Sequence, residues 1–116
     1  MKKLGKIKKM ENPEKKIIDL NKIKDKEELR RIYEDLKKEK KIVMTSGYFD
    51  PLHHGHIELF KLSKKLGDCL IVVINNDNQT MQKKGYVFMP AEEKAKIIIE
   101  LECVDEVFIS IDKDQT

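Results

Sequence analysis

The 116-residue chain contains few of the residues that characterise secreted and membrane-spanning proteins. Its two cysteines are too few for the disulfide framework of a small secreted domain. It has no apolar run near the roughly 18 residues that a membrane-spanning helix needs, and no signal-peptide core follows the lysine-rich start. We therefore expect a cytoplasmic protein without membrane contacts, with Cys69 and Cys103 reduced and buried as small apolar side chains.

The charged residues are not predominantly of one sign either. The 24 basic and 21 acidic residues leave a formal charge of +3, although residues 1–41 hold 16 of the basic and only 9 of the acidic ones. A basic arm over residues 1–24 is compatible with binding to nucleic acid or to a membrane surface. Acidic residues interleave through this arm, and Tyr33 is the single aromatic residue before position 42. This pattern favours a solvated arm and argues against nucleic acid as a partner.

Apolar spacing predicts three helices and three strands in alternation. A stripe at i, i+3, i+4 and i+7 after Asp25 indicates a helix, and the continuous apolar run 69–74 indicates a strand buried on both faces. Gly67 suits a left-handed helix end, and residues 75–88 form a polar loop in this interpretation. We expect helices over 25–39, 54–66 and 90–102, and strands over 42–45, 69–74 and 104–111.

This order predicts an α/β fold: a Rossmann-like parallel sheet of three strands, β-α-β-α-β, preceded by an N-terminal helix. The domains are then a basic arm (1–24), the N-terminal helix (25–40) and the α/β domain (41–116). Three strands and two helices make a thin core, so we expect the N-terminal helix, or a homodimer, to cover exposed sheet. Ligands of such sheets bind beyond the carboxyl ends of the strands.

The loop after the first predicted strand carries the strongest functional signal. Gly47 allows a ligand to approach the backbone, and the helix expected after the loop points free N–H groups towards it, which attracts phosphate. His53 and His56 are three residues apart and share one face of that helix start, with Gly55 leaving room between them. Two imidazoles so placed can stabilise the charge that grows on a phosphorus centre during transfer.

Two other interpretations of the histidines remain open. Zinc would require ligands at i and i+4 on a helix or nearby cysteines, and the loop offers neither, so no metal ligand is assigned. The loop could also be an ordinary helix start capped by Asp50.

The loop resembles the first signature of the cytidylyltransferase-like nucleotidyltransferase superfamily, which it matches at Gly47-x-Phe49-Asp50-x-x-His53-x-Gly55-His56. The resemblance extends over residues 42–116. It implies transfer of a nucleoside monophosphate from CTP or ATP to a small phosphorylated sugar or alcohol, with release of pyrophosphate. It also implies Mg²⁺, held largely by phosphate oxygens. Residues 102–105 resemble the heptose-phosphate adenylyltransferases, which favours ATP.

The resemblance assigns a role to each matching residue. His53 and His56 would contact the triphosphate and stabilise the transition state, and Asp50 would hold the loop and the helix start. Nucleotide contacts are expected from Thr45, Ser46, Gly47, Tyr48, Phe49, Asp50 and Gly55, and substrate or phosphate contacts from Lys83, Lys84 and Lys94.

Three features depart from the resembled pattern. Lys94 stands where relatives usually carry arginine, and lysine lacks the bidentate fork of that side chain. Glu102 stands where glycerol-3-phosphate cytidylyltransferases carry arginine. The sequence stops at Thr116, before the two further strands and the second signature of the resembled family. A catalytically incomplete nucleotide-binding half-domain, or an assembly subunit, is therefore the alternative function.

Overall fold

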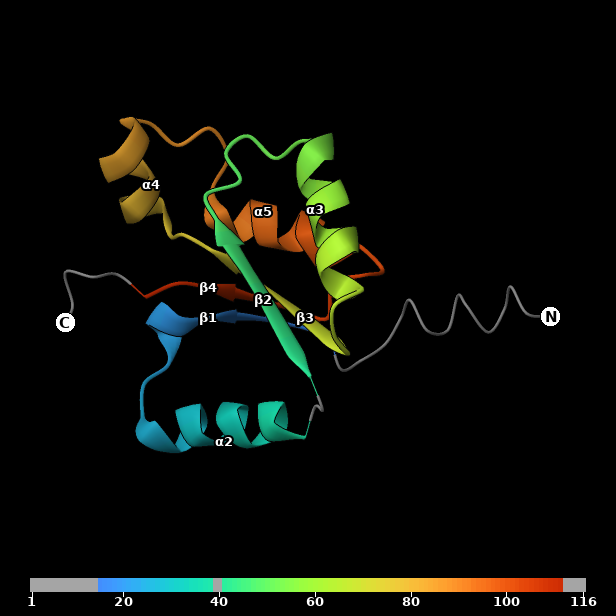
Figure 1. Cartoon of the computed structure of the whole chain (residues 1–116). Coiled ribbons are helices and arrows are strands. Elements are labelled where there is room, and N and C mark those ends of the chain that lie inside the picture. The colour runs from blue at the N-terminus through green and yellow to red at the C-terminus, as the bar shows by residue number, and fades with distance from the viewer. Residues whose placement is uncertain (1–14, 39–40, 112–116) are drawn as a thin grey trace.

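A four-stranded parallel sheet lies between helices on both of its faces in this computed structural model, which describes residues 15–38 and 41–111 (Figure 1). The strands pair in the order β1-β4-β3-β2, and every pairing is parallel. They are β1 (Lys16–Asp19), β2 (Ile42–Gly47), β3 (Cys69–Ile74) and β4 (Glu106–Ile109). The Rossmann-like α/β class is thus confirmed, and the predicted number of strands is corrected from three to four.

The strand that the sequence analysis missed is β1, which lies inside the expected loose arm. Its four residues, KIID, offer two apolar side chains and no clear periodicity. It forms by pairing with β4, with Ile17 opposite Val107, so its partner lies far away in the sequence. The short 3₁₀ helix η1 (Leu20–Lys22) follows it. Residues 15–24 are therefore part of the fold, whereas residues 1–14 of the expected arm lie outside the described residues.

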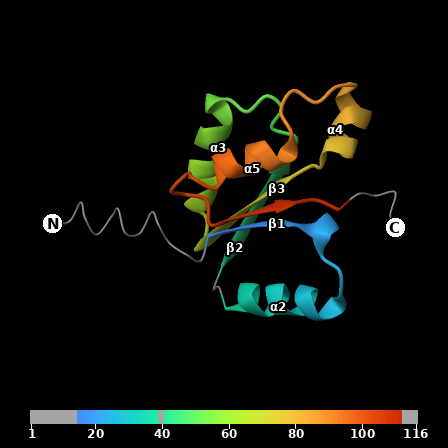
Figure 2. The same ribbon diagram turned by 180° about the vertical axis from the view of Figure 1, so that it is seen from behind.

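Three helices lie on one side of the sheet and one helix covers the other face (Figures 1 and 2). They are α3 (His54–Lys64), α4 (Asp77–Lys84) and α5 (Ala91–Ile98) on the first face and α2 (Lys26–Lys37) on the second. Asp25 caps α2, because its side chain accepts a hydrogen bond from the amide of Glu28 at 2.8 Å. As expected, the N-terminal helix covers part of the sheet.

The core has two parts, one on each face of β3. Phe60, Ile98 and Val107 belong to the larger cluster under α3 and α5, while Ile71 and Phe108 form the smaller one under α2. Five of the six side chains of β3 are buried, which confirms the expectation of a strand covered on both faces. Each fully buried side chain of this kind contributes about 1.5–3 kcal/mol, so β3 is the centre of the fold.

Helix α4 corrects a second expectation, because it occupies most of the predicted loop 75–88. Its start is a capping box in which Asn76 and Gln79 exchange side-chain and backbone hydrogen bonds. Its end is Gly85, whose φ of +84° is the left-handed conformation that favours glycine. The helix is almost entirely polar and shows no apolar stripe, so periodicity gave no sign of it; the Asn-x-x-Gln spacing was the available signal.

Gly67 does not adopt the left-handed conformation that the sequence suggested. Helix α3 ends at Lys64 with a right-handed C-cap, and Gly67 lies in the turn towards β3. A Cβ atom at this position would lie 2.6 Å from Cγ2 of Val43 and 2.9 Å from the carbonyl oxygen of Lys41. Close packing against β2, not backbone conformation, therefore accounts for this glycine.

Smaller differences concern the ends of elements. Helix α5 begins after Pro90, which is its N-cap, and ends at Ile98, four residues before the predicted end. The last strand begins at Glu106 and not at Val104. Cys69 is buried as expected, whereas Cys103 is half-buried, and neither of the two is in a disulfide.

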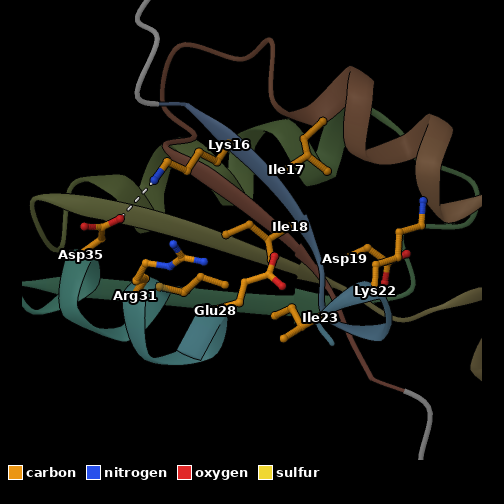
Figure 3. A pocket seen from close by; sticks show the side chains of 10 residues that line it. Lys16, Ile17, Ile18, Asp19, Lys22, Ile23, Glu28, Arg31 and Asp35 are labelled. Atoms are coloured by element: carbon orange, nitrogen blue, oxygen red, sulfur yellow. Dashed lines mark hydrogen bonds and ion pairs between the residues drawn. The ribbon is translucent and has the colours of Figure 1, made fainter. Parts of the chain in front are cut away.

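A hollow of about 480 Å³ lies between β1 and α2 (Figure 3). Glu28, Arg31 and Asp35 of α2 line it opposite β1, and Lys16 pairs with Asp35 at 3.3 Å. This flank of α2 therefore faces the β1 edge of the sheet. Among residues 15–38 and 41–111, no helix is long and apolar enough to cross a membrane.

Candidate functional site

The signature loop lies at the carboxyl ends of β2 and β3, where ligands of parallel sheets bind. It runs from the end of β2 to the start of α3, and the carbonyl oxygen of Gly47 accepts a hydrogen bond from Asn75 at 3.0 Å. This bond joins the loop to the segment after β3, from which α4 begins. The two segments after neighbouring strands therefore form one site.

His53 and His56 form a capping box at the start of α3. The Nδ1 atom of His53 accepts a hydrogen bond from the amide of Gly55 at 3.1 Å, and Nδ1 of His56 accepts one from the amide of His53, also at 3.1 Å. The two rings stack with their centroids 4.0 Å apart and an interplanar angle of 28°. The alternative interpretation held that Asp50 caps this helix. The structure shows that the histidines cap it instead.

This capping arrangement sets the tautomer of both neutral imidazoles. Because each Nδ1 accepts from a backbone N–H, the proton of the neutral ring resides on Nε2, which we assign from the hydrogen-bond geometry. Burial lowers the pKa of His56, and the neighbouring His53 lowers this pKa further. The site therefore presents two stacked imidazoles, each with an Nε2–H donor, at the N-terminus of a helix, where the helix dipole also favours an anion.

Phe49 supports the histidine pair from inside the protein. Its buried ring meets the edge of His56 at a centroid distance of 5.0 Å and that of Phe60 at 5.3 Å. Its backbone φ of +49° is uncommon for a residue with a large side chain. The peptide bond between Asp50 and Pro51 that follows is cis. Phe49 therefore lies under the site and links it to the larger core cluster.

Asp50 is buried and joins the signature loop to the segment that precedes α5. Its carboxylate accepts hydrogen bonds from the amides of Phe88 at 2.8 Å and Met89 at 2.9 Å, and Nζ of Lys94 lies 3.8 Å away. Burial alone would raise the pKa of Asp50, but these amides and the charge of Lys94 outweigh it and hold the pKa below its usual value. Asp50 thus joins the loop to the α5 side of the site, and not to the start of α3.

Lys94 and Lys84 both bind the backbone of the signature loop. Lys94 is fully buried and donates to the carbonyl oxygen of Tyr48 at 2.8 Å, and Lys84 donates to that of Asp50. Burial lowers the pKa of Lys94, opposed by the charges of Asp50 and Asp77. In this structure the Lys94 ammonium is enclosed by the loop, so direct contact with phosphate would require it to move.

Lys83 lies apart from these two lysines, on the exposed side of α4. It lines a hollow of about 280 Å³ at the carboxyl ends of β2 and β3. The other residues of this hollow are Tyr48, Asn75, Gln79 and Gln82, of which only Tyr48 was singled out from the sequence. The missed residues come from α4 and its approach, so recognising that helix from its capping box would have brought them to attention.

Of the remaining predicted residues, Thr45 and Ser46 are the last two residues of β2 before Gly47. Thr45 is half-buried and Ser46 is exposed. Gly55 lies inside the histidine pair, where a Cβ would come within 2.9 Å of Cε1 of His53. Gly55 is therefore in direct contact with the histidine pair, whereas Lys94 lies beneath the loop.

Comparison with known proteins places this site in a family context. The family model described as cytidylyltransferase-like matches residues 44–116. The bifunctional protein HldE of a Nitratiruptor species is 43% identical over 90 residues, which cover 75% of this chain and 20% of that protein. The FAD synthase of Thermococcus kodakarensis is 45% identical over 74 residues, covering 62% of this chain and 50% of that enzyme.

A solved structure supports the same relationship. The lipopolysaccharide core biosynthesis protein from Thermoplasma volcanium superimposes with a TM-score of 0.59 and 37% identity, over 63% of this chain and 60% of that one. The chain thus spans half or less of the two curated relatives. The family model covers the signature loop, all three helices of the first face and β4. The chain therefore belongs to the cytidylyltransferase-like family.

Proposed function

We propose that the chain is a nucleotidyltransferase that binds the triphosphate of CTP or ATP at the start of α3. It transfers the nucleoside monophosphate to the phosphate of a small sugar or alcohol. The observation that carries this proposal is the pair of Nε2–H donors of His53 and His56, which stack at 4.0 Å at the positive end of a helix. This arrangement suits an anion with several oxygens better than it suits a neutral ligand.

In the proposed reaction, a phosphate oxygen of the acceptor attacks the α-phosphorus of the nucleotide. A new phosphorus–oxygen bond forms, the bond to the bridging oxygen of the β-phosphate breaks, and pyrophosphate leaves with that electron pair. The two imidazoles donate to triphosphate oxygens on which negative charge grows. Because the capping box already holds the rings, little reorganisation is needed during the reaction.

The choice of the nucleotide base rests on sequence similarity, and the choice of the acceptor rests on the hollow beside Lys83. Residues 102–105 resemble the heptose-phosphate adenylyltransferases, and relatives named HldE and FAD synthase match this chain, so we favour ATP over CTP. The hollow beside Lys83 offers side-chain amides and one ammonium group. These groups suit an acceptor with hydroxyls and a phosphate.

Mg²⁺ enters the proposal with the nucleotide. Within the two described ranges, no group of three or more His, Cys, Asp or Glu side chains could hold a metal ion. The carboxylate of Asp50 is engaged by two amides and by Lys94. The described residues therefore do not fit a resident ion, and in this proposal Mg²⁺ arrives as part of the Mg²⁺–nucleotide substrate.

The test has two stages, binding and then turnover. Thermal unfolding is measured with Mg²⁺ and each of ATP, CTP, GTP and UTP, because a ligand at about 100 times its Kd adds about 2.7 kcal/mol to the folded state. Release of pyrophosphate is then measured with a panel of sugar and polyol phosphates. We expect a shift with one nucleotide that is lost in the His53→Ala/His56→Ala double variant.

His54→Ala is the matched control, since His54 is exposed and its side chain pairs with Glu58 at 3.6 Å, away from the stacked rings. It should keep both the shift and the turnover. Equal shifts in the wild-type chain and the double variant would contradict the proposed site. The alternative function, nucleotide binding without turnover or assembly with a partner, predicts a nucleotide-specific shift without release of pyrophosphate.

A further inference from the structure

Ser110, the residue after β4, joins three elements at the carboxyl end of the sheet. Its amide donates to the carbonyl oxygen of Ile74 at 2.9 Å, next to the pairing of β4 with β3. Its own carbonyl oxygen accepts from Nδ2 of Asn21 at 2.7 Å and from Nδ2 of Asn76 at 3.2 Å. Its hydroxyl donates to Oε1 of Gln79. Every hydrogen-bonding group of Ser110 is therefore engaged, and together they connect η1, β3 and the start of α4.

Asn21 is held in one orientation by the residue at the end of β1. Its backbone amide and its Nδ2 atom both donate to Oδ1 of Asp19 at 2.9 Å. Because the Asp19 carboxylate and the Ser110 carbonyl are both acceptors, the side-chain atom between them is the amide nitrogen, with one hydrogen for each. Asn21 lies outside residues 44–116, which the family model matches. This contact therefore comes from a part of the chain that the family model leaves out.

The bonds around Gln79 leave its side chain one donor and no acceptor for a ligand. Oε1 already accepts from the amide of Asn76 at 3.1 Å and from the hydroxyl of Ser110. Nε2 donates one of its two hydrogens to the carbonyl oxygen of Ile111 at 3.1 Å. A backbone N–H can only donate and a carbonyl can only accept, so these partners assign the two ends of the amide. One Nε2–H of Gln79 therefore remains for a ligand oxygen.

Lys83 lies four residues after Gln79, so the two side chains share one face of α4. Both line the hollow of about 280 Å³, together with Tyr48, Asn75 and Gln82. These lining side chains supply an ammonium group, amides and a phenol, but no carboxylate. An amide N–H and an ammonium group one helical turn apart suit two oxygens of a single phosphate group.

We propose that Asn21 is a positioning residue for the acceptor: through Ser110 it holds Gln79 so that the remaining Nε2–H binds an oxygen of the acceptor's phosphate group. Lys83 binds a second oxygen of the same phosphate. This inference rests on the proposed function, in which the hollow beside Lys83 receives the acceptor. Asn21 acts at a distance from the histidine pair, so its removal weakens acceptor binding and leaves nucleotide binding unchanged.

The proposed contacts also select the chemical class of the acceptor. A phosphate monoester has three terminal oxygens, so one remains for attack on the α-phosphorus after Gln79 and Lys83 have bound the other two. A carboxylate has two oxygens and would keep none for the attack. Because Gln79 offers only a donor, a group that needs a hydrogen-bond acceptor finds no partner in this side chain. The hollow therefore favours phosphate esters over carboxylic acids.

Nuclear magnetic resonance of the Gln79 side-chain amide tests the proposal, with inorganic phosphate as the probe. Phosphate carries the oxygens that all the proposed acceptors share, and its binding needs no turnover. We expect the Nε2 resonances of Gln79 to shift on titration. The Kd read from them should rise about threefold or more in Asn21→Ala, the size expected when a hydrogen bond is weakened. The imidazole resonances of His53 and His56 report separately on phosphate at the start of α3 and should give the same Kd in both chains.

Two further variants accompany Asn21→Ala. Ser110→Ala removes only the hydroxyl that binds Gln79 and should raise the same Kd, which keeps the test independent of any effect of Asn21→Ala on folding. Lys22→Ala is the matched control, because Lys22 follows Asn21 and its exposed side chain pairs with Glu92 at 3.5 Å. It should leave the Kd at Gln79 unchanged. Far-UV circular dichroism checks that each variant is folded.

Steady-state kinetics separates positioning from a general loss of structure. If Asn21 acts through Gln79, Asn21→Ala should raise the KM for the acceptor in the wild-type chain but not in a chain that already carries Gln79→Leu. The KM for the nucleotide should stay the same in all of these chains. A purely structural role would instead lower kcat, through the folded fraction, or raise both KM values.

Three results would overturn the proposal. The first is a set of Gln79 resonances that do not respond to phosphate, and the second is an equal Kd in the wild type and Asn21→Ala. The third is an additive effect of Asn21→Ala and Gln79→Leu on the KM for the acceptor. Failure of the proposed function has a different signature, which is a wild-type chain that releases no pyrophosphate. The titration of Gln79 with phosphate would still decide the role of Asn21 in that case.

Discussion

At the scale of single residues, the Nδ1 and Nε2 atoms of the two signature histidines have separate roles. The Nδ1 atoms cap the start of α3, and the Nε2 atoms are free to donate to a ligand. A substitution can therefore remove one role and keep the other. This separation makes it possible to distinguish loss of stability from loss of chemistry at His53 and His56.

His53 allows the most direct separation of the two roles. Asparagine is among the best N-cap residues, so His53→Asn should leave the free energy of unfolding nearly unchanged while abolishing nucleotide transfer. His53→Ala removes the cap as well and should cost about 0.5–2 kcal/mol. Urea unfolding and pyrophosphate release measure the two effects. Full activity in His53→Asn would contradict the proposed role of Nε2.

The lowered pKa of His56 predicts how stability depends on pH. The folded state binds the His56 proton less readily than the unfolded chain, whose pKa is about 6.5. This contribution to stability is therefore fully present above about pH 6.5 and is lost as pH falls through the lower folded pKa. Urea unfolding at a series of pH values on both sides of the histidine pKa should show a weaker pH dependence in His56→Gln than in the wild type. Glutamine keeps a capping-box side chain without the titration.

Gly55 is predicted to act through the position of His53. An alanine Cβ would lie 2.9 Å from Cε1 of His53, so Gly55→Ala should displace the ring and lower transfer strongly with a modest effect on stability. Gly85→Ala is the opposite case, because its φ is +84° and no atom lies near the added Cβ. It should lower stability by about 1 kcal/mol and leave the ratio of activity to folded protein unchanged.

At the scale of elements, α5 holds the signature loop by inserting a buried ion pair under it. Lys94 comes from α5, and Asp50 comes from the loop after β2. The pair also binds backbone groups on both sides: Tyr48 through Lys94, and Phe88 and Met89 through Asp50. These contacts therefore hold the loop, the segment before α5 and α5 itself together.

Removing one partner of this pair should be more damaging than removing both. Lys94→Met leaves Asp50 buried without its nearby cation and should cost about 3–5 kcal/mol of stability. The Asp50→Asn/Lys94→Met double variant should lose less than the sum of the two single variants in urea unfolding. Additive losses would show that the two residues act independently. Lys94→Arg should retain more stability than Lys94→Met, because it keeps the charge.

How well each element was predicted from the sequence depends on where its stability comes from. Strand β3 was recognised from its run of apolar residues, because burial of those side chains stabilises it. Helix α4 was missed because it is stabilised by its capping box and by Gly85, with little apolar burial. The histidines and Asp50 were predicted as site residues, but the enclosure of Lys94 under the loop depends on packing that no local pattern encodes.

At the scale of the whole molecule, β1 and β2 occupy opposite edges of the sheet, and α2 crosses the face between them (Figure 2). The first described strand is therefore part of the same folded unit as the signature loop. Asn21, just after β1, donates to the carbonyl oxygen of Ser110, whose hydroxyl binds Gln79 of α4. The N-terminal segment thereby reaches the hollow beside Lys83 through Ser110 and Gln79.

Ile18 provides the test of this placement. It packs against the smaller core cluster, so Ile18→Asp should lower the free energy of unfolding by about 2 kcal/mol or more. Lys24→Asp, at an exposed position of the same segment, should change it by no more than about 0.5 kcal/mol. Thermal unfolding measures both variants. Equal and small effects would indicate that residues 16–19 do not form a strand in solution.

The pairing of β1 with β4 also has a consequence for how the protein is made. Lys16 lies opposite Glu106, so the first described strand cannot find its neighbour until the residues up to Glu106 have left the ribosome. Contacts between such distant segments form late, because closing a long loop costs entropy before the contact gains anything. The β2–α3–β3 unit, which carries the signature loop, can assemble earlier from neighbouring segments. During synthesis the histidine pair would therefore be in place before the sheet is complete.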